Sequence, residues 1–164
     1  MKFTRRFALT GAALALAGCV PALGSFPQPR VTEIKVYKAR RKMTLLSNGF
    51  PIRRYDIDLG SDPIGPKRQR GDGKTPEGRY HITHVNTQSA FTLSLGINYP
   101  NAEDLRLARA AGVDPGDDIF IHGLPNGYGS AVPDWTNGCV AVANDDIKEI
   151  VALVKPGTPI TIYP

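Results

Sequence analysis

The residues of this chain that are best suited to covalent chemistry lie around Cys139, which follows Gly138. A cysteine thiolate is a strong nucleophile, and a neighbouring imidazole that accepts the thiol proton can generate it. His122 lies seventeen positions earlier, and the Gly- and Pro-rich segment between the two residues can loop back. Gly138 would let backbone N–H groups approach a substrate closely and stabilise an oxyanion. The pattern predicts nucleophilic acyl transfer at Cys139.

Single residues of these types also have simpler explanations. A lone cysteine is often a small buried apolar residue, and a lone histidine is often structural. A zinc site is disfavoured, because His81 and His84 lack the spacing of paired ligands and no second cysteine remains for it. We therefore predict no metal. The residues alone leave both the catalytic and the structural interpretation of Cys139 and His122 open.

The other cysteine, Cys19, ends a segment typical of an export signal. Basic residues precede the apolar run 7–17, which is too short to span a bilayer but has the length of a signal-peptide core. The Leu-Ala-Gly-Cys sequence that ends at Cys19 resembles a bacterial lipobox, in which the cysteine is lipid-modified. We predict a signal peptide over 1–18, lipid attachment at Cys19 and a tether over 19–30. A plain secretory signal and a buried N-terminal helix are the alternatives.

This leader predicts a lipid-anchored protein on the periplasmic face of a membrane, with no segment that spans it. Val20 rather than Asp after Cys19 favours the outer membrane. Arg5 and Arg6 partly resemble a twin-arginine signal, so the export route stays open. If lipid consumes Cys19, then Cys139 has no disulfide partner, and an unpaired thiol outside the cytoplasm is expected only where it is buried or used.

Composition restricts the class of protein further. Hydrophobic residues make up 41% of the 164 residues and charged residues 21%, which is typical of a folded domain rather than a disordered chain. The net charge is +5, and Lys2, Arg5 and Arg6 of the predicted leader carry three of these charges. The remaining +2, with no basic stripe, predicts no nucleic-acid partner.

The elements that must position Cys139 and His122 are mainly strands. Seventeen Gly and fourteen Pro indicate many turns, and Asn48-Gly49 is a strong hairpin signal. Asn101 can cap a helix that runs to about Ala111, and Asn144 can cap a second. We predict one mainly β domain over 31–164, β-sandwich-like or an open barrel, with two short helices. The strand signals cover 31–37, 43–46, 52–59, 80–83, 91–99, 119–122 and 160–163.

Two motifs near the predicted nucleophile resemble the L,D-transpeptidase (YkuD-type) catalytic domains. That family carries a His-Gly pair followed by Ser/Thr-x-Gly-Cys, as this chain does at 122–123 and 136–139. The segment 71–80 resembles the upstream Thr-Pro-x-Gly-aromatic element, and 93–104 is similar to a branch that includes a peptidoglycan-lipoprotein amidase. The resemblance covers 31–164, and it implies an L,D-transpeptidase catalytic fold.

The resemblance also implies roles for individual residues. Cys139 would attack the stem-peptide amide that follows an L-centre, and His122 would take the thiol proton and pass it to the leaving amine. The Gly123 carbonyl would orient the imidazole. Backbone N–H groups of Asn137, Gly138 and Cys139 would form an oxyanion hole. No metal or organic cofactor is implied.

Some positions depart from the family pattern. Asn137 stands where many members have His, and Ala141 stands where many have an Arg that could clamp a carboxylate. The basic loop segment 67–74 could face acidic stem peptides instead, or it could be solvated and mobile. Substrate contacts are expected from residues that packing could equally explain: Tyr99, Trp135 and Thr136.

Three functions remain open at this level. The first is a peptidoglycan L,D-transpeptidase that acts through a Cys thioester in peptidoglycan biosynthesis, cell-wall organisation and cell shape. The second is a hydrolase of the same class, an L,D-carboxypeptidase or a peptidoglycan-lipoprotein amidase. The third is a non-catalytic wall-binding lipoprotein. The predicted partners are peptidoglycan stem peptides, a wall-linked lipoprotein, and a membrane through the lipid anchor.

Overall fold

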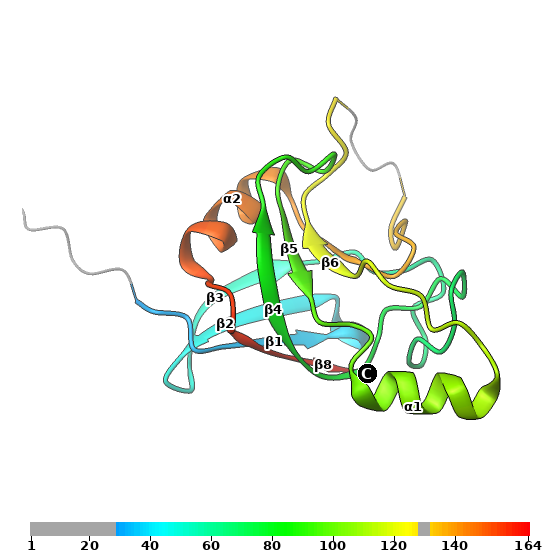
Figure 1. Cartoon of the computed structure of the whole chain (residues 1–164). Helices are drawn as coiled ribbons and strands as arrows, with labels where there is room; N and C mark the ends of the chain where they lie inside the picture. The colour runs from blue at the N-terminus through cyan, green and yellow to red at the C-terminus, as the bar shows by residue number, and fades with distance from the viewer. Residues whose placement is uncertain (1–28, 128–131) are drawn as a thin grey trace, which may run out of the picture.

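Alternating apolar residues build the first strands of the domain, which a computed structural model describes over residues 29–127 and 132–164 (Figure 1). In β1 (Glu33–Tyr37) the side chains of Ile34 and Val36 are fully buried. Strands β2 (Lys42–Ser47) and β3 (Phe50–Asp56) form the predicted hairpin. Asn48 and Gly49 connect them with φ angles of 49° and 84°. Two successive left-handed residues are what a tight hairpin turn requires, so the Asn-Gly prediction is confirmed.

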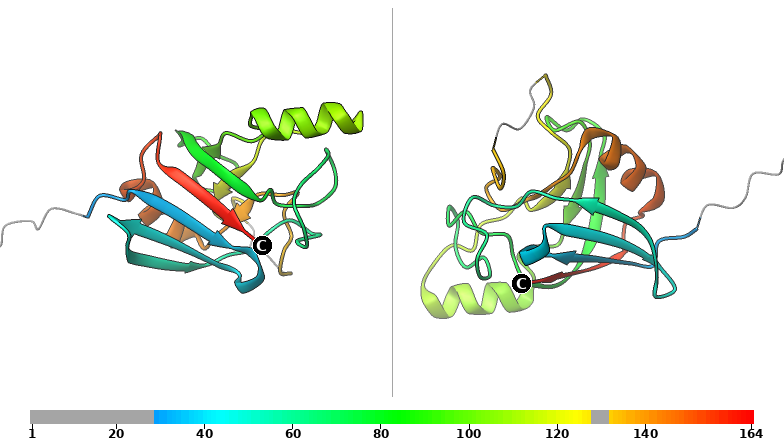
Figure 2. Two further views of the ribbon diagram at one scale, coloured as in Figure 1. Left: turned by 90° about the horizontal axis from the view of Figure 1, so that it is seen from below. Right: turned by 180° about the vertical axis from the view of Figure 1, so that it is seen from behind.

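Within the described residues, eight strands form one curled sheet in the order β3-β2-β1-β8-β4-β5-β6-β7 (Figures 1 and 2). The C-terminal strand β8 lies parallel to β1 in the middle of the sheet. The mainly β fold with two helices is therefore confirmed. The remaining strands are β4 (Gly78–Asn86), β5 (Ser94–Ile97), β6 (Phe120–His122), β7 (Val140–Ala141) and β8 (Pro159–Tyr163), and a 3-10 turn, η1 (Lys38–Arg40), follows β1.

The concave side of the sheet encloses an aliphatic core. Burying each Ile, Leu or Met side chain stabilises the fold by roughly 1.5–3 kcal/mol, before the loss of conformational entropy is counted. This core therefore supplies a rigid support for the loops at the end of the sheet that carries Cys139. Its fully buried members include Ile34, Val36, Met43, Leu45, Leu59, Ile82, Leu95, Ile121, Ile147, Ile150 and Ile160.

Two α-helices flank the sheet at opposite sides (Figure 1). Helix α1 (Ala102–Ala111) begins as predicted, because the Asn101 side chain accepts hydrogen bonds from the N–H groups of Glu103 and Asp104. It ends at Gly112, whose φ is 68°. Helix α2 (Asn144–Leu153) buries Ile147 and Ile150 against the core. None of the helices in the described ranges combines the length and hydrophobicity needed to cross a bilayer.

The structure corrects the predicted cap of α2. Ala143 is the N-cap residue, and Asn144 is the first residue of the helix. The Asn144 Oδ1 atom instead accepts hydrogen bonds from the Leu124 N–H (2.8 Å) and from the Thr92 hydroxyl (2.9 Å). A tertiary contact has thus replaced the local capping bond. It ties the segment after His122 to the helix.

The predicted strand 91–99 is also shorter than expected. Only Ser94–Ile97 form β5, and Thr92 adopts a left-handed conformation with φ of 67°. The Thr92 N–H donates to the side chain of Asn126 at 2.9 Å, so this segment turns instead of continuing the ladder. The turn takes Phe91 out of the predicted strand and leaves it free to pack elsewhere.

Candidate active site

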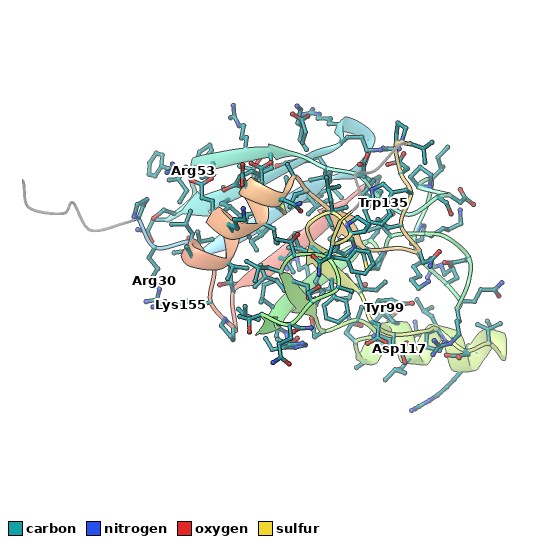
Figure 3. The ribbon with its side chains drawn as sticks, turned by 90° about the horizontal axis from the view of Figure 1, so that it is seen from above. Arg30, Arg53, Tyr99, Asp117, Trp135 and Lys155 are labelled. Atoms are coloured by element: carbon teal, nitrogen blue, oxygen red, sulfur yellow. The ribbon has the colours of Figure 1, made fainter. Side chains whose placement is uncertain are left out.

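A cavity of about 930 Å³ lies at the end of the sheet where β6 and β7 meet. Both Cys139 and His122 line it, together with the aromatic side chains of Phe91 and Trp135. Trp135 lies toward the end of the molecule away from Arg30 and Lys155 (Figure 3). The volume is in the range of small-ligand sites in proteins. The two residues predicted to do covalent chemistry therefore share one accessible cavity.

Strand pairing explains how these two residues meet. Strands β6 and β7 are parallel, with Ile121 opposite Val140. Cys139 directly precedes β7, so it lies opposite Phe120 on β6. Phe120 is two residues before His122 on that strand. Because side chains alternate along a strand, residues 120 and 122 point to the same face, and residue 139 shares that face. The long loop after His122 returns the nucleophile to the strand that carries the imidazole.

The imidazole of His122 is held in one orientation. Its Nδ1 atom lies 2.7 Å from the carbonyl oxygen of Gly123. Because a carbonyl only accepts hydrogen bonds, Nδ1 carries the proton and Nε2 has the free lone pair. The ring packs against Phe91 (centroids 4.5 Å apart) and Trp135 (5.6 Å). Burial lowers the pKa of His122 below its ordinary value, although the bond to Gly123 acts in the opposite direction. The resting imidazole is therefore neutral near pH 7.

Gly123 has a steric reason to be glycine. A Cβ atom on this residue would lie 2.7 Å from Asn144 Oδ1 and 3.0 Å from the carbonyl oxygen of Phe91. The same backbone accepts the imidazole proton and donates its own N–H to the Phe91 oxygen at 3.1 Å. Any side chain here would move the carbonyl that orients His122.

Cys139 is half-buried, and its thiol makes two weak hydrogen bonds. Its Sγ atom accepts from the Phe120 N–H at 3.4 Å and donates to the Asp118 carbonyl at 3.5 Å. Burial raises the thiol pKa above its ordinary value, the Phe120 N–H lowers it, the Asp118 charge raises it and the Lys67 charge lowers it. Among the described residues no hydrogen bond joins this thiol to the imidazole. The resting pair is a neutral thiol beside a neutral imidazole.

Thr136 organises the loop that presents the nucleophile. Its buried hydroxyl donates to the Cys139 carbonyl at 2.9 Å and accepts from the Gly138 N–H at 3.1 Å. The Gly138 N–H is therefore already engaged, contrary to its predicted place in an oxyanion hole. Within the described residues, the backbone N–H groups of Asn137 and Cys139 make no hydrogen bond. Gly138 itself is needed for space, because a Cβ would lie 2.6 Å from the Lys74 carbonyl oxygen.

Comparison with known proteins fits this arrangement. Residues 32–162 match the L,D-transpeptidase catalytic domain family (YkuD). The chain belongs to this family. It is 29% identical over 150 residues to YafK of Escherichia coli K12, whose name assigns it to the L,D-transpeptidases; the match covers 80% of this chain and 53% of YafK. The chain thus spans about half the length of the curated relatives it matches.

Several solved structures have a similar fold. Bd1075 of Bdellovibrio bacteriovorus aligns with a TM-score of 0.61 and 31% identity, over 82% of this chain and 48% of that protein. The helical cell shape determining protein Pgp2 of Campylobacter jejuni aligns with a TM-score of 0.64 and 22% identity, over 80% of this chain and 47% of that one. The L,D-transpeptidase of Xylanimonas cellulosilytica aligns with a TM-score of 0.52 and 14% identity, over 84% of this chain and 62% of that one, and this likeness confirms the L,D-transpeptidase fold.

In this L,D-transpeptidase domain an ion pair anchors the loop that carries the nucleophile. Asp134 accepts hydrogen bonds from the Arg41 guanidinium, at 2.9 Å to Nε and 2.6 Å to Nη2, and from the Leu59 N–H at 3.0 Å. The next two residues, Trp135 and Thr136, form part of the cavity wall. The geometry links the β1–β2 connection to the position of Trp135 on His122.

We expect Asp134→Ala to lower the free energy of unfolding by about 2 kcal/mol, since the Arg41 charge and the Leu59 N–H lose their acceptor in a partly buried site. Urea denaturation measures this change. The exposed pair Lys42–Asp56 provides the matched control, and Asp56→Ala should cost less than about 1 kcal/mol. Equal costs for the two substitutions would contradict an anchoring role for Asp134.

The structure places Tyr99 outside the cavity that holds Cys139 and His122, contrary to its predicted substrate contact. Its side chain is 5% exposed, and its hydroxyl donates to the Pro115 carbonyl at 2.9 Å. Its ring packs edge-on against Tyr80. Tyr99 is therefore a core residue. Trp135 and Thr136 do line the cavity, as does the exposed side chain of Asn137.

The basic loop 67–74 was predicted either to face acidic stem peptides or to be solvated and mobile. In the structure, ion pairs hold it in place. Lys67 is 5% exposed and pairs with Asp72 at 2.9 Å. Arg70 pairs with Asp114 and Asp117. These cations are neutralised within the protein, so the loop forms one wall of the cavity rather than a free basic surface. In the described part of the chain, no group of three or more His, Cys, Asp or Glu side chains could hold a metal ion.

The sequence alone missed several residues of the site. The strand pattern over 91–99 gives no sign that Phe91 belongs to the site, and Asp118 and Phe120 contact the thiol through backbone atoms that carry no sequence signal. Asp134 had a weak signal, since it adjoins the Trp-Thr-x-Gly-Cys motif. Its partner Arg41 lies more than ninety residues away in the chain, and no local pattern points to it. Cys19 and the predicted leader lie outside the described residues.

Proposed function

We propose that this domain is a peptidoglycan L,D-transpeptidase that transfers an acyl group through a thioester on Cys139. One observation carries the proposal. The contact between His122 Nδ1 and the Gly123 carbonyl leaves Nε2 free as a base in the cavity shared with the thiol. Nucleophile, base and orienting group form the three-part arrangement that other acyl-transfer enzymes use.

Acylation begins from the neutral pair. The thiol turns from the Asp118 carbonyl toward Nε2 of His122, which accepts its proton. The thiolate attacks the amide carbonyl of a stem peptide, and a C–S bond forms. The C–N bond of that amide then breaks, and the leaving amine takes the proton from His122. The products of this half-reaction are a Cys139 thioester, a neutral imidazole and a free amine.

Deacylation regenerates the thiol. A neutral amine attacks the thioester carbonyl and forms a new C–N bond, while the C–S bond breaks. The proton lost by the attacking nitrogen passes to His122 and then to the sulfur. Water can follow the same route, in which case the product is a carboxylic acid and the enzyme is a hydrolase.

The N–H groups of Asn137 and Cys139 are the proposed donors to the oxyanion of both tetrahedral intermediates. They make no hydrogen bond to the described residues, whereas the Gly138 N–H is held by Thr136. Donors that are already in place before reaction cost no reorganisation in the transition state. The Thr136 hydroxyl therefore supports the hole by setting the turn rather than by contacting substrate.

We further propose that the domain works outside the cytoplasm, anchored by lipid at Cys19. The apolar run 7–17 and the Leu-Ala-Gly-Cys sequence support this location. Acyl transfer on wall peptides requires the cavity to meet peptidoglycan, and a lipid anchor with a short tether would keep the domain near the wall.

Intact mass spectrometry of the purified protein with a tetrapeptide muropeptide tests the proposal. We expect a thioester adduct on Cys139 and a released D-amino acid. Adding a second stem peptide as acceptor separates the outcomes, because a transpeptidase yields a cross-linked dimer and a hydrolase only a trimmed peptide. Absence of any adduct or product with active-site Cys139 reduced would favour the non-catalytic wall-binding alternative.

The pH dependence of the reaction follows from the resting state, in which the Cys139 thiol and the His122 imidazole are both neutral. Because burial lowers the pKa of His122 below 6.5, the base stays deprotonated down to more acidic pH than a free histidine. We expect kcat/KM for D-amino acid release to fall only below about pH 6.5. Because the thiol pKa is raised above 9.0, iodoacetamide alkylation of Cys139 should still accelerate above pH 9. An acid limb above pH 7, or a thiol fully reactive at pH 7, would contradict these environments.

A further inference from the structure

Lys38 is a lysine that the fold buries almost completely. It is 2% exposed and lies in η1, the turn that follows β1. Its Nζ atom donates to three acceptors: the Gly65 carbonyl at 2.6 Å, the Thr75 carbonyl at 2.9 Å and the Glu77 carboxylate at 2.8 Å. An ammonium has three N–H groups, so all of them are used. Because a buried charge is costly unless it is fully paired, these acceptors must keep their places around it.

The three acceptors belong to the segment 60–77, which lies in the connection between β3 and β4 (Figure 2). Within this segment Thr75 is fully buried. Its carbonyl binds Lys38, and its hydroxyl accepts a hydrogen bond from the Gly60 N–H at 3.0 Å. Thr75 therefore joins the start of the segment to the buried ammonium near its end.

The start of this segment also binds the loop that carries the nucleophile. The Ser61 N–H donates to the Thr136 carbonyl at 3.0 Å, and the Thr136 N–H donates to the Leu59 carbonyl at 3.1 Å. The Thr136 hydroxyl in turn donates to the Cys139 carbonyl at 2.9 Å. A continuous set of buried contacts thus leads from the Lys38 ammonium to the backbone of Cys139.

The backbone of the same turn supports the nucleophile loop by a second route. The Lys38 carbonyl accepts a hydrogen bond from the Arg41 N–H at 3.1 Å. The Arg41 guanidinium binds Asp134, the residue at which that loop is anchored. One short turn therefore holds the nucleophile loop at both of its ends, although Lys38 itself does not line the cavity.

We propose that Lys38 is a positioning residue for acyl transfer, whose buried ammonium fixes the segment 60–77 and thereby the place of Cys139. The proposal rests on the proposed function. Lys38 lies outside the cavity, so it acts on the geometry of attack rather than on binding of the acyl donor. A small displacement of a nucleophile slows the chemical step, whereas the segment 86–91 on the other side of the cavity keeps its place. Loss of Lys38 should therefore lower kcat and leave KM nearly unchanged.

The first test is K38M, which removes the ammonium and keeps a long side chain. Release of a D-amino acid from a tetrapeptide donor gives kcat and KM. Each kcat is divided by the folded fraction from circular dichroism, because unfolded protein would also lower it. We expect kcat per folded molecule to fall by roughly 10- to 100-fold, with KM changed less than about twofold. K35M is the matched control, since Lys35 lies on β1 in a partly exposed pair with Glu33 and should leave both constants unchanged.

T75V tests the same connection without removing a charge, and it decides the case if K38M does not fold. It removes the hydroxyl that holds the Gly60 N–H and keeps the carbonyl that binds Lys38. We expect kcat per folded molecule to fall about tenfold with KM preserved. T158V is the matched control: it removes a buried threonine hydroxyl that donates to the Lys155 carbonyl, away from the cavity, and should keep the wild-type kcat.

Hydrogen exchange without any donor gives a measurement that does not depend on the reaction. Amides of the segments 59–61 and 134–141 should exchange at least about tenfold faster in T75V and in folded K38M than in the wild type. Unchanged exchange, or an unchanged kcat per folded molecule in T75V, overturns the positioning role and leaves acyl transfer intact. If the wild type releases no D-amino acid, the proposed function fails instead, and the exchange rates alone then decide whether Lys38 holds the nucleophile loop.

Discussion

Cys139→Ser should reduce acyl-enzyme formation at least about 10³-fold without unfolding the domain. A serine hydroxyl ionises far less readily than a thiol, and the site offers little to activate it. The hydrogen-bond partners of Sγ are the Phe120 N–H and the Asp118 carbonyl. The neighbouring imidazole is a weak base because it is buried. The measurement is the rate of D-amino acid release from a tetrapeptide donor, with urea denaturation to confirm that the variant folds.

Cys139→Ala provides the companion variant, which removes every nucleophile from this position. It should show no covalent adduct with the donor, whereas it should bind the donor as well as wild type does. A serine or alanine variant with a tenth or more of the wild-type rate would show that the thiol is not the nucleophile. A non-catalytic wall-binding protein would instead release no D-amino acid even as the wild type.

His122→Gln should lower kcat/KM for the same donor by about 10²–10⁴-fold. The amide of Gln can still donate to the Gly123 carbonyl, but it provides no lone pair that accepts the thiol proton at the required basicity. The variant should also lose the acid limb of the pH–rate profile, since the group that titrates has been removed. A steady-state rate assay between pH 5 and pH 9 measures both effects.

His81→Gln is the matched control for that substitution. His81 is exposed on β4 and does not line the cavity. Its replacement should leave both the rate and the pH profile unchanged. If His122→Gln kept the acid limb, another group would have to be the base.

Much of the fold follows from short-range rules that can be read along the chain. Asn48-Gly49 makes a hairpin because both residues tolerate positive φ. Helix α1 starts at Asn101 and ends at Gly112 because the side chain of one and the backbone freedom of the other satisfy the helix ends. These features depend on neighbours within a few positions, so sequence-based prediction succeeds.

The wrong predictions share a different cause. Asn144 gives its side chain to Leu124 and Thr92 rather than to its own helix. Tyr99 fits a groove-lining role by residue type, yet its hydroxyl is satisfied inside the core by Pro115. In both cases a partner distant in sequence competes with the local choice, and the tertiary contact wins.

For the site, residue types alone specify which chemistry is available: a thiol and an imidazole, with glycines where backbone must approach closely. That both groups line one cavity depends on the parallel pairing of β6 with β7, which joins segments far apart in the chain. Tertiary contacts also make the Gly138 N–H donate to Thr136 instead of serving an oxyanion. Residue type sets what a group can do, whereas partners, burial and charge balance arise from contacts between segments far apart in the chain.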